Sequence, residues 1–221
     1  VEVTSWTEQA ASVTNTGSAG SVPTYLESGI NYNPSLNFDG SSEKLTINDL
    51  SNLPSGAEER SLIIVGQLGT GDNNYRYAFS HGNDATGEAH GFGQSNSALV
   101  GSYNGRSSNS TYSSYFTVDD AFIGAGYYSG TQAVLGKDGE LLDSTALSWN
   151  TKNSEGGSVG YVGAWVNAGL YWQGEIAEII SFNERLGYVD RLKVMSYLGI
   201  KYGITQTVNN DGDGTSGETI L

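Results

Sequence analysis

Two stretches decide the fold of this chain: YWQGEIAEIISFN at residues 171–183 and RLKVMSYLGIKYGIT at residues 191–205. The first predicts a long strand over residues 172–182, rich in β-branched and aromatic side chains. The second continues a helical pattern over about residues 188–202, and Gly203 then supplies the C-terminal stop. Apolar side chains recur there at spacings of three and four: Val189, Leu192, Met195 and Leu198. Such a stripe needs a surface to cover, and the outer face of the preceding strand is the nearest one.

Strand signals extend outward from this C-terminal unit. Residues 62–65, Leu-Ile-Ile-Val, form a continuous apolar run, which predicts a central strand covered on both faces. Asp138-Gly139 stands between two apolar pairs and predicts a hairpin over residues 133–142. Further strands are expected at residues 36–38, 45–47, 75–79, 89–92, 98–103 and 158–165.

The composition agrees with a β-rich fold. The chain has 221 residues with 31 Gly, 14 Tyr and only three Pro, which is typical of many short strands joined by tight turns. This length suits one large β domain. We therefore expect a single domain over residues 1–205, followed by an Asp/Gly-rich linker or tail at residues 206–221.

Charge and cysteine content exclude several classes of partner. Ten basic against 24 acidic residues give a net charge of −14, which repels nucleic acid and anionic lipid. No apolar run approaches the roughly 20 residues of a membrane span, so membrane insertion is not expected. Without cysteine, disulfides are excluded, and any metal would be a hard cation such as Ca²⁺. The acidic, cysteine-free composition is common in secreted bacterial surface proteins, so we expect an extracellular or cell-surface fragment of a longer chain.

Residues 31–40 (NYNPSLNFDG), together with the two C-terminal stretches, resemble laminin-G-like, concanavalin A-like jelly-roll modules of bacterial surface and adhesion proteins. The sequence departs from that pattern at Gly187, where Ser is usual, and at Glu175, where Asp is more frequent. The resemblance implies an all-β fold: a two-sheet antiparallel jelly-roll sandwich with one short C-terminal helix. It also implies a binding role, without naming the ligand.

Glu175 and Glu178 form the most enzyme-like feature, because related glycanases carry paired carboxylates on one strand. Those acids are spaced by even numbers, so that both face the sugar. Here the spacing is three, which places the two side chains on opposite faces of a regular strand. The sequence therefore predicts no catalysis.

Glu178 would instead share a face with Ile176 and Ile180, where a carboxylate is costly unless it is paired or metal-bound. The resemblance implies a structural Ca²⁺ near this strand, with Glu178, Asp39 and the carbonyl of Gly40 as ligands. The alternative is an ion pair with a basic residue of the covering helix: Arg191, Lys193 or Lys201.

Two further groups suggest metal chemistry more weakly. Residues 209–214 resemble the opening of a calcium loop and make Asp211 and Asp213 candidate ligands. Ile220 stands where that loop needs a bidentate Glu, so a plain linker is the alternative. His81 and His90 are interpreted as surface histidines of a hairpin loop.

Aromatic residues near Gly-rich turns are the candidate ligand-binding residues, since exposed rings stack on sugars: Trp165, Tyr127, Tyr128 and Tyr171. Trp172 is expected in the core. The predicted function is a non-catalytic adhesion module of a larger secreted or surface bacterial protein that binds a glycan or surface peptide with calcium support. Two alternatives stay open: a structural spacer that contacts only neighbouring modules of the same chain, and a glycan-active hydrolase or lyase.

Overall fold

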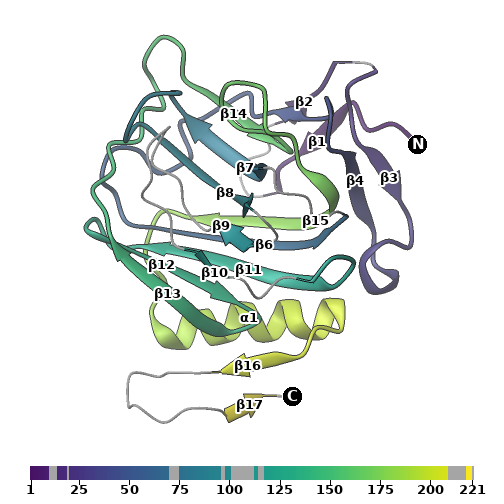
Figure 1. Cartoon of the computed structure of the whole chain (residues 1–221), viewed down its shortest axis with the longest axis vertical. Coiled ribbons are helices and arrows are strands. Elements are labelled where there is room, and N and C mark those ends of the chain that lie inside the picture. Colours follow the sequence, from purple (N-terminus) through teal and green to yellow (C-terminus); the bar gives the residue numbers. More distant parts are fainter. Residues whose placement is uncertain are drawn as a thin grey trace.

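The computed structural model describes residues 1–9, 14–18, 20–69, 75–95, 98–100, 112–113, 117–208 and 218–220. Within these residues the strands form two large antiparallel sheets that face each other (Figure 1). The eight-stranded sheet has the order β1 (Ser5–Thr7), β2 (Thr14–Thr16), β5 (Leu45–Thr46), β14 (Val159–Val162), β7 (Arg76–Gly82), β8 (Ala89–Ser95), β9 (Ala98–Val100), β10 (Tyr112–Ser113). The seven-stranded sheet has the order β13 (Glu140–Ala146), β12 (Gln132–Lys137), β11 (Ala121–Tyr128), β6 (Arg60–Leu68), β15 (Gln173–Phe182), β4 (Ser35–Asp39), β3 (Thr24–Leu26).

One 3-10 turn and one α-helix complete the described elements. The turn is η1 (Ile30–Tyr32), the helix is α1 (Tyr188–Tyr202), and a separate pair of strands follows, β16 (Gln206–Val208) and β17 (Glu218–Ile220). The predicted fold class, an all-β antiparallel two-sheet jelly-roll sandwich with one short C-terminal helix, is confirmed. No helix in the described part of the chain is long and apolar enough to span a membrane.

Strand β6 lies at the centre of the seven-stranded sheet, between β11 and β15. Its side chains alternate, so Leu62 and Ile64 face the core between the sheets while Ile63 and Val65 face α1. All four are fully buried. The continuous apolar run therefore correctly predicted a central strand that is covered on both faces.

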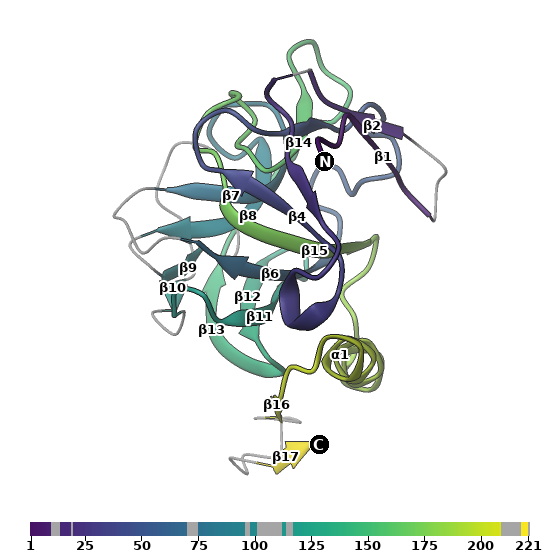
Figure 2. The same ribbon diagram turned by 90° about the vertical axis from the view of Figure 1, so that its right-hand side faces the viewer.

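The core between the two sheets is built from large apolar side chains of both layers, among them Phe38, Phe92, Phe122, Trp172 and Ile176. Trp172 is 0% exposed, which confirms its predicted place in the core. A second core lies on the other face of the seven-stranded sheet, beneath α1 (Figure 2).

Helix α1 covers this second face. It begins after Gly187 and ends at Gly203, whose φ of +63° is left-handed and whose N–H donates to the Gly199 carbonyl oxygen. Met195 and Leu198 are buried against the sheet. The predicted bounds are confirmed, and so is the packing of Met195 and Leu198 against the outer face of this sheet, but Val189 of the predicted stripe is 60% exposed.

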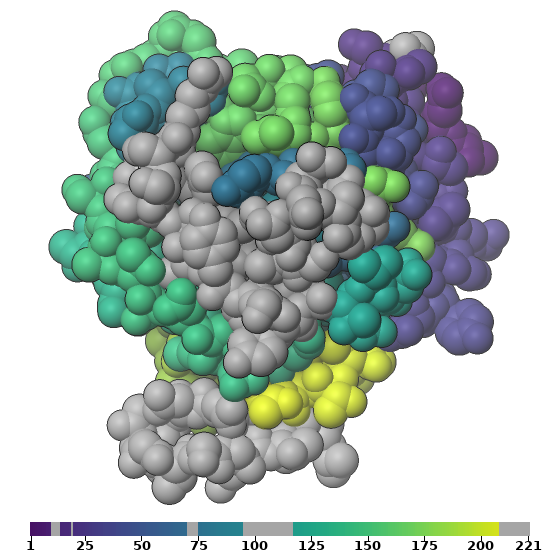
Figure 3. All heavy atoms as spheres, viewed as in Figure 1, coloured from purple at the N-terminus to yellow at the C-terminus, as the bar shows by residue number. Residues whose placement is uncertain are grey.

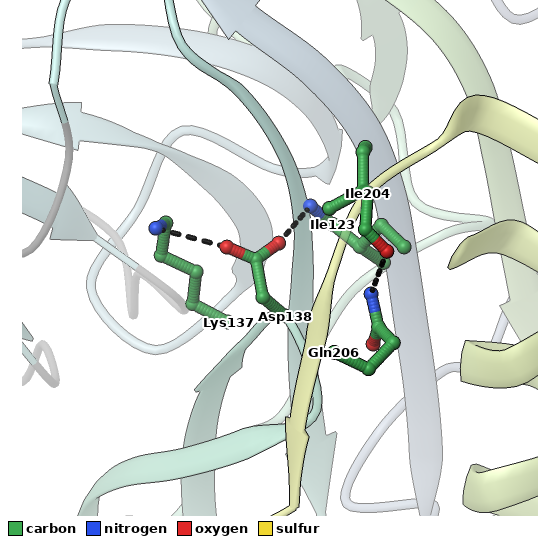
Figure 4. A network of polar contacts seen from close by, with 5 residues as sticks. All are labelled: Ile123, Lys137, Asp138, Ile204 and Gln206. Atoms are coloured by element: carbon green, nitrogen blue, oxygen red, sulfur yellow. Dashed lines mark hydrogen bonds and ion pairs between the residues drawn. The ribbon is translucent and has the colours of Figure 1, made fainter. Parts of the chain in front are cut away.

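The predicted hairpin joins β12 and β13, with positive φ at Asp138 (49°) and Gly139 (90°), as a tight hairpin turn requires. Figure 4 shows that Asp138 also anchors neighbouring elements. Its carboxylate accepts from the Ile123 backbone N–H at 2.7 Å and pairs with Lys137 at 2.9 Å. The N–H of Thr207 donates to the Asp138 carbonyl at 2.7 Å, so β16 lies against the hairpin turn. The domain boundary at residue 205 remains a prediction.

Candidate functional site

Strand β15 carries a β-bulge in the middle of its acidic motif. Its pairing with β6 shifts register between Ile176 and Glu178, which leaves Ala177 as an extra residue. Ile176 faces the core between the sheets, whereas Ala177 and Ile180 pack on the side of α1. The extra residue reverses the alternation, so Glu175 and Glu178 both face the side that α1 covers. The prediction that they face opposite sides is wrong, and Glu178 does not share a face with Ile176.

Each of these carboxylates already has partners in the fold. Glu175 accepts a hydrogen bond from the Ser35 hydroxyl of β4 at 2.6 Å. Glu178 pairs with Lys201 of α1 at 2.7 Å and accepts from the Tyr202 hydroxyl at 2.9 Å. The predicted alternative of an ion pair with the covering helix is thus confirmed, with Lys201 as the base.

The pKa values of Lys201 and Tyr202, which both contact Glu178, are raised. Partial burial by itself lowers the pKa of Lys201, but the hydrogen bond and the negative charge of Glu178 raise it overall. Burial, together with the hydrogen bond to Glu178, raises the pKa of Tyr202 to about 12. These three side chains connect the sheet to the last turn of α1.

Replacing Glu178 should loosen this connection. We expect Glu178→Ala to lower the free energy of unfolding by about 2 kcal/mol, because it removes one charged and one hydroxyl hydrogen bond. Glu178→Gln, which keeps an acceptor for Tyr202, should cost only about 1 kcal/mol, since Lys201 is partly solvated. Urea denaturation at pH 7 measures both. A stability of Glu178→Gln equal to that of the wild type would show that the charge contributes nothing.

The residues predicted to hold calcium are not brought together. Asp39 pairs with Gln173 in β15, five residues before Glu178, which corresponds to about 16 Å along a strand. The carbonyl oxygen of Gly40 accepts from the Arg76 guanidinium at 3.0 Å, so a cationic side chain already occupies it. Glu178, Asp39 and Gly40 therefore do not fit a single coordination shell.

Asp39 itself closes a turn. Its carboxylate accepts from the backbone N–H groups of Ser41 at 2.8 Å and Ser42 at 3.1 Å, and from the Ser41 hydroxyl. Although partial burial raises the pKa of Asp39, these hydrogen bonds lower it overall. No group of three or more His, Asp or Glu suited to a metal exists among the described residues. Asp211 and Asp213 lie outside those residues, and calcium binding stays a prediction.

Three of the four predicted sugar-stacking aromatics are buried. Trp165 is 3%, Tyr127 3% and Tyr128 1% exposed, so the expected surface positions are wrong. Trp165 packs 4.5 Å from the ring of Tyr77 and donates to Asp84 at 3.0 Å. Tyr127 lies beneath α1, where burial raises its pKa to about 12. Tyr171 is half-buried.

The glycines near these rings explain the error. Gly91 and Gly124 lie inside strands β8 and β11, and not in turns. A Cβ at Gly91 would lie 2.6 Å from the Trp165 ring, and one at Gly124 would lie 2.3 Å from the Phe92 ring. These glycines make room for aromatic packing instead of for a loop.

His81 and His90 are opposite neighbours in β7 and β8, so their predicted place in a surface loop is wrong. Both point into the end of the sandwich core and are 1% and 3% exposed. The amide nitrogen of Asn153 donates to the carbonyls of Leu53 and Pro54, so its oxygen accepts from His81 Nδ1 at 2.9 Å. His81 Nε2 must then accept from His90 Nδ1 at 3.2 Å. This chain of hydrogen bonds needs the His81 imidazole neutral, and burial lowers the pKa of His81 to about 4.

Arg60 is buried beside the histidines, with only 1% exposed. Its guanidinium donates to the carbonyls of Glu58 and Gly56, both at 3.0 Å, and to the Thr151 hydroxyl at 2.8 Å. It also lies 5.5 Å from the ring centres of Tyr128 and Trp149. Burial lowers the pKa of Arg60 to about 10.

Asn153 also forms one wall of a surface hollow of about 430 Å³. The hollow lies between the segment that follows β5 and the segment that precedes β14. Strand β14 lies on the side of the sandwich far from α1 (Figures 1 and 2). Its lining is mostly polar: Thr46, Ile47, Asn48, Asp49, Leu50, Ser51, Asn153, Ser154, Ser158 and Val159. A second cavity, between the β12–β13 hairpin and α1, holds only about 30 Å³, which is close to the volume of one water molecule.

An unpaired hydroxyl inside the hollow and a group of aromatic and basic side chains beside it could contact a ligand. The Ser158 hydroxyl is buried and has no hydrogen-bond partner among the described residues. Thr46 of the lining pairs across the strands with Tyr161, and Lys44 Nζ lies 5.8 Å and 5.5 Å from the ring centres of Tyr161 and Tyr171. We call Lys44, Tyr161 and Tyr171 the Tyr-Lys patch. All three are half-buried, and Tyr161 adjoins the lining of the hollow through its pairing with Thr46.

The fold and this hollow define the class of protein: an antiparallel β-sandwich module with a polar surface hollow at one end. Figure 3 shows that residues of the β14 region, in green, and the N-terminal strands, in purple, form the molecular surface opposite α1. No family model matches the sequence, and no curated protein matches it.

Solved structures, by contrast, do match the fold. A Trypanosoma rangeli sialidase in complex with sialic acid superposes with a TM-score of 0.61 at 13% identity over 91% of this chain, which spans only 32% of the sialidase. The Ruminococcus gnavus IT-sialidase CBM40 bound to alpha2,3 sialyllactose gives 0.55 at 14%, over 73% of this chain and 96% of that one. Domain 4 of AbnA, a GH43 extracellular arabinanase from Geobacillus stearothermophilus in complex with arabinotriose, gives 0.59 at 13%, over 80% and 82%. At these identities the likeness shows the fold alone.

Proposed function

We propose that this chain is a non-catalytic glycan-binding module whose sugar lies in the hollow and on the Tyr-Lys patch. The observation that carries this proposal is the buried Ser158 hydroxyl, which has no partner among the described residues and lines a polar hollow of about 430 Å³. Leaving a buried polar group unpaired is costly, and a sugar hydroxyl would satisfy it. Two modules of similar fold were solved with a bound oligosaccharide, which supports the same kind of ligand here.

The lining offers the contacts that a saccharide needs. Side chains of Asn48, Ser51 and Ser154 supply donors and acceptors for hydroxyl groups. Tyr161 and Tyr171 supply ring faces beside the hollow for the C–H faces of a sugar. The volume lies within the usual range of ligand sites.

The carboxylates favour binding over hydrolysis. A glycosidase needs two carboxyl groups flanking one bond. Among the described residues that line the hollow, Asp49 is the one carboxylate, and Glu175 and Glu178 face α1. We therefore propose a binding role outside the cell, as part of a larger secreted or surface protein; the arabinanase of similar fold is itself described as extracellular.

Ser158→Ala is the most direct test of the site. After a glycan array identifies a ligand, calorimetry should show about tenfold weaker binding by Ser158→Ala, because a buried hydrogen bond to the sugar is lost. The free energy of unfolding should stay unchanged or rise slightly, since the hydroxyl has no partner in the free protein.

Ser181→Ala, on the exposed surface of β15, is the matched control and should leave affinity unchanged. If no glycan on the array bound, the proposal would be refuted and the alternative role of a structural spacer would be favoured. Release of reducing sugar from a bound glycan would favour the hydrolase or lyase. Unchanged affinity of Ser158→Ala would place the ligand elsewhere.

A further inference from the structure

We infer that Lys44 makes the proposed site selective for acidic saccharides, with the sugar carboxylate at Lys44 and the uncharged part of the ligand in the hollow. This inference rests on the proposed function and names the chemical class of its ligand. Its basis is the unusual surroundings of one lysine in an acidic chain.

The chain contains five lysines, and four of them pair with a carboxylate. The pairs are Lys137 with Asp138 at 2.9 Å, Lys152 with Glu155 at 2.7 Å, Lys193 with Asp190 at 2.8 Å and Lys201 with Glu178 at 2.7 Å. Lys44 has no carboxylate partner among the described residues, although acidic residues outnumber basic ones by 24 to 10. Its positive charge is available to a ligand.

The Tyr-Lys patch holds that charge in place. Lys44 Nζ lies 5.8 Å from the ring centre of Tyr161 and 5.5 Å from that of Tyr171, so both rings border the ammonium group. The group keeps donors that can reach a carboxylate, and each such charge-assisted hydrogen bond is stronger than a neutral one. The flanking rings offer apolar faces to the sugar that carries the carboxylate.

Asp49 sets the orientation of the ligand. The described residues that line the hollow include no lysine or arginine and one carboxylate, that of Asp49, which accepts from the Ser51 N–H at 2.8 Å. The hydrogen bonds from Ser51 lower the pKa of Asp49, so this group is anionic at neutral pH. The carboxylate of an acidic ligand is therefore repelled by Asp49, and the ligand binds with its hydroxyl groups toward Asp49.

Paired ligands test the selectivity. Affinities are measured by calorimetry for sialyllactose against lactose, and for trigalacturonate against arabinotriose. We expect the acidic member of at least one pair to bind more tightly, and its affinity to fall as NaCl rises from 50 to 500 mM. Lys44→Gln should weaken acidic ligands about tenfold and neutral ligands less than about twofold.

Two further variants separate charge from shape. Lys44→Arg keeps the charge and should retain acidic binding within about threefold, whereas Asp49→Asn removes the neighbouring negative charge and should strengthen acidic binding by up to about threefold. Thermal melts check that each variant is folded. Neutral ligands that bind as tightly as acidic ones, or an unchanged preference in Lys44→Gln, would overturn this inference and leave the glycan-binding proposal standing. Absence of binding to every sugar would remove both.

Discussion

Acidification from pH 7 to pH 4 is expected to lower the free energy of unfolding by about 3 kcal/mol through His81 alone. Burial is the main cause that lowers the pKa of His81 from 6.5 to about 4, and the positive charge of Arg60 lowers it further. The pKa of His90 also lies well below its usual value. Burial is the main cause, and the charges of Arg60 and of His81 lower it further. His90 therefore adds to the loss.

The direction follows from proton binding. Below pH 6.5 the histidines of the unfolded chain bind protons while those of the folded protein stay neutral, so protons favour unfolding. The histidine contribution is fully present above pH 6.5 and is lost as the pH falls toward 4. Each histidine contributes a slope of about 1.4 kcal/mol per pH unit in this window, or nearly 3 for the pair.

Urea denaturation at half-unit steps from pH 7.5 to 4 measures the slope. The matched control is the double variant His81→Gln/His90→Gln, whose amides do not titrate in this range. It should be less stable at pH 7 and show a much flatter profile between pH 6.5 and 4. Identical slopes for both proteins would mean that carboxylates elsewhere cause the acid sensitivity.

Arg60→Met is expected to lower the free energy of unfolding by about 3 kcal/mol, because four hydrogen bonds from the guanidinium are lost and removal of the buried charge offsets only part of that loss. Methionine fills similar space but leaves the carbonyls of Gly56 and Glu58 and the hydroxyl of Thr151 without this donor. Arg60→Lys keeps the charge but does not offer the same planar set of donors, so it should lose about half as much.

A second measurement distinguishes the charge of Arg60 from its packing. Because Arg60 lowers the pKa of both His81 and His90, its removal should move their pKa values toward 6.5 and flatten the acid profile. Arg60→Lys should preserve the wild-type profile. If Arg60→Met destabilised the protein without any change in pH dependence, the electrostatic link between Arg60 and the histidines would be refuted.

Local sequence patterns predicted the elements of the fold well. The run at residues 62–65, the Asp138-Gly139 turn and the stripe of α1 each depend on side chains close in sequence, and each is confirmed. The predictions of which side chains are buried failed where burial depends on residues distant in the sequence. Trp165 is buried against Tyr77 and Gly91, and Tyr128 against Trp149, all of which lie far from them in the sequence.

The candidate site was missed for the same reason. Lys44, Asn153 and Ser158 belong to segments about 110 residues apart, and nothing in their immediate sequence marks them as neighbours. The Asn-Asp pair at residues 48–49 and the serines at 154 and 158 were the only local signs of a polar surface. Pairing of β5 with β14 brings the two segments together.

Residues 171–183 show most clearly which features local sequence determines and which features depend on the tertiary structure. They predicted a strand with Trp172 in the core, and residues 191–205 predicted the helix that follows, because alternation and helical spacing are properties of the local chain. Only the tertiary structure decided where Glu175 and Glu178 point. The bulge at Ala177 arises from pairing with β6, and one extra residue turns every later side chain of β15 to the other face.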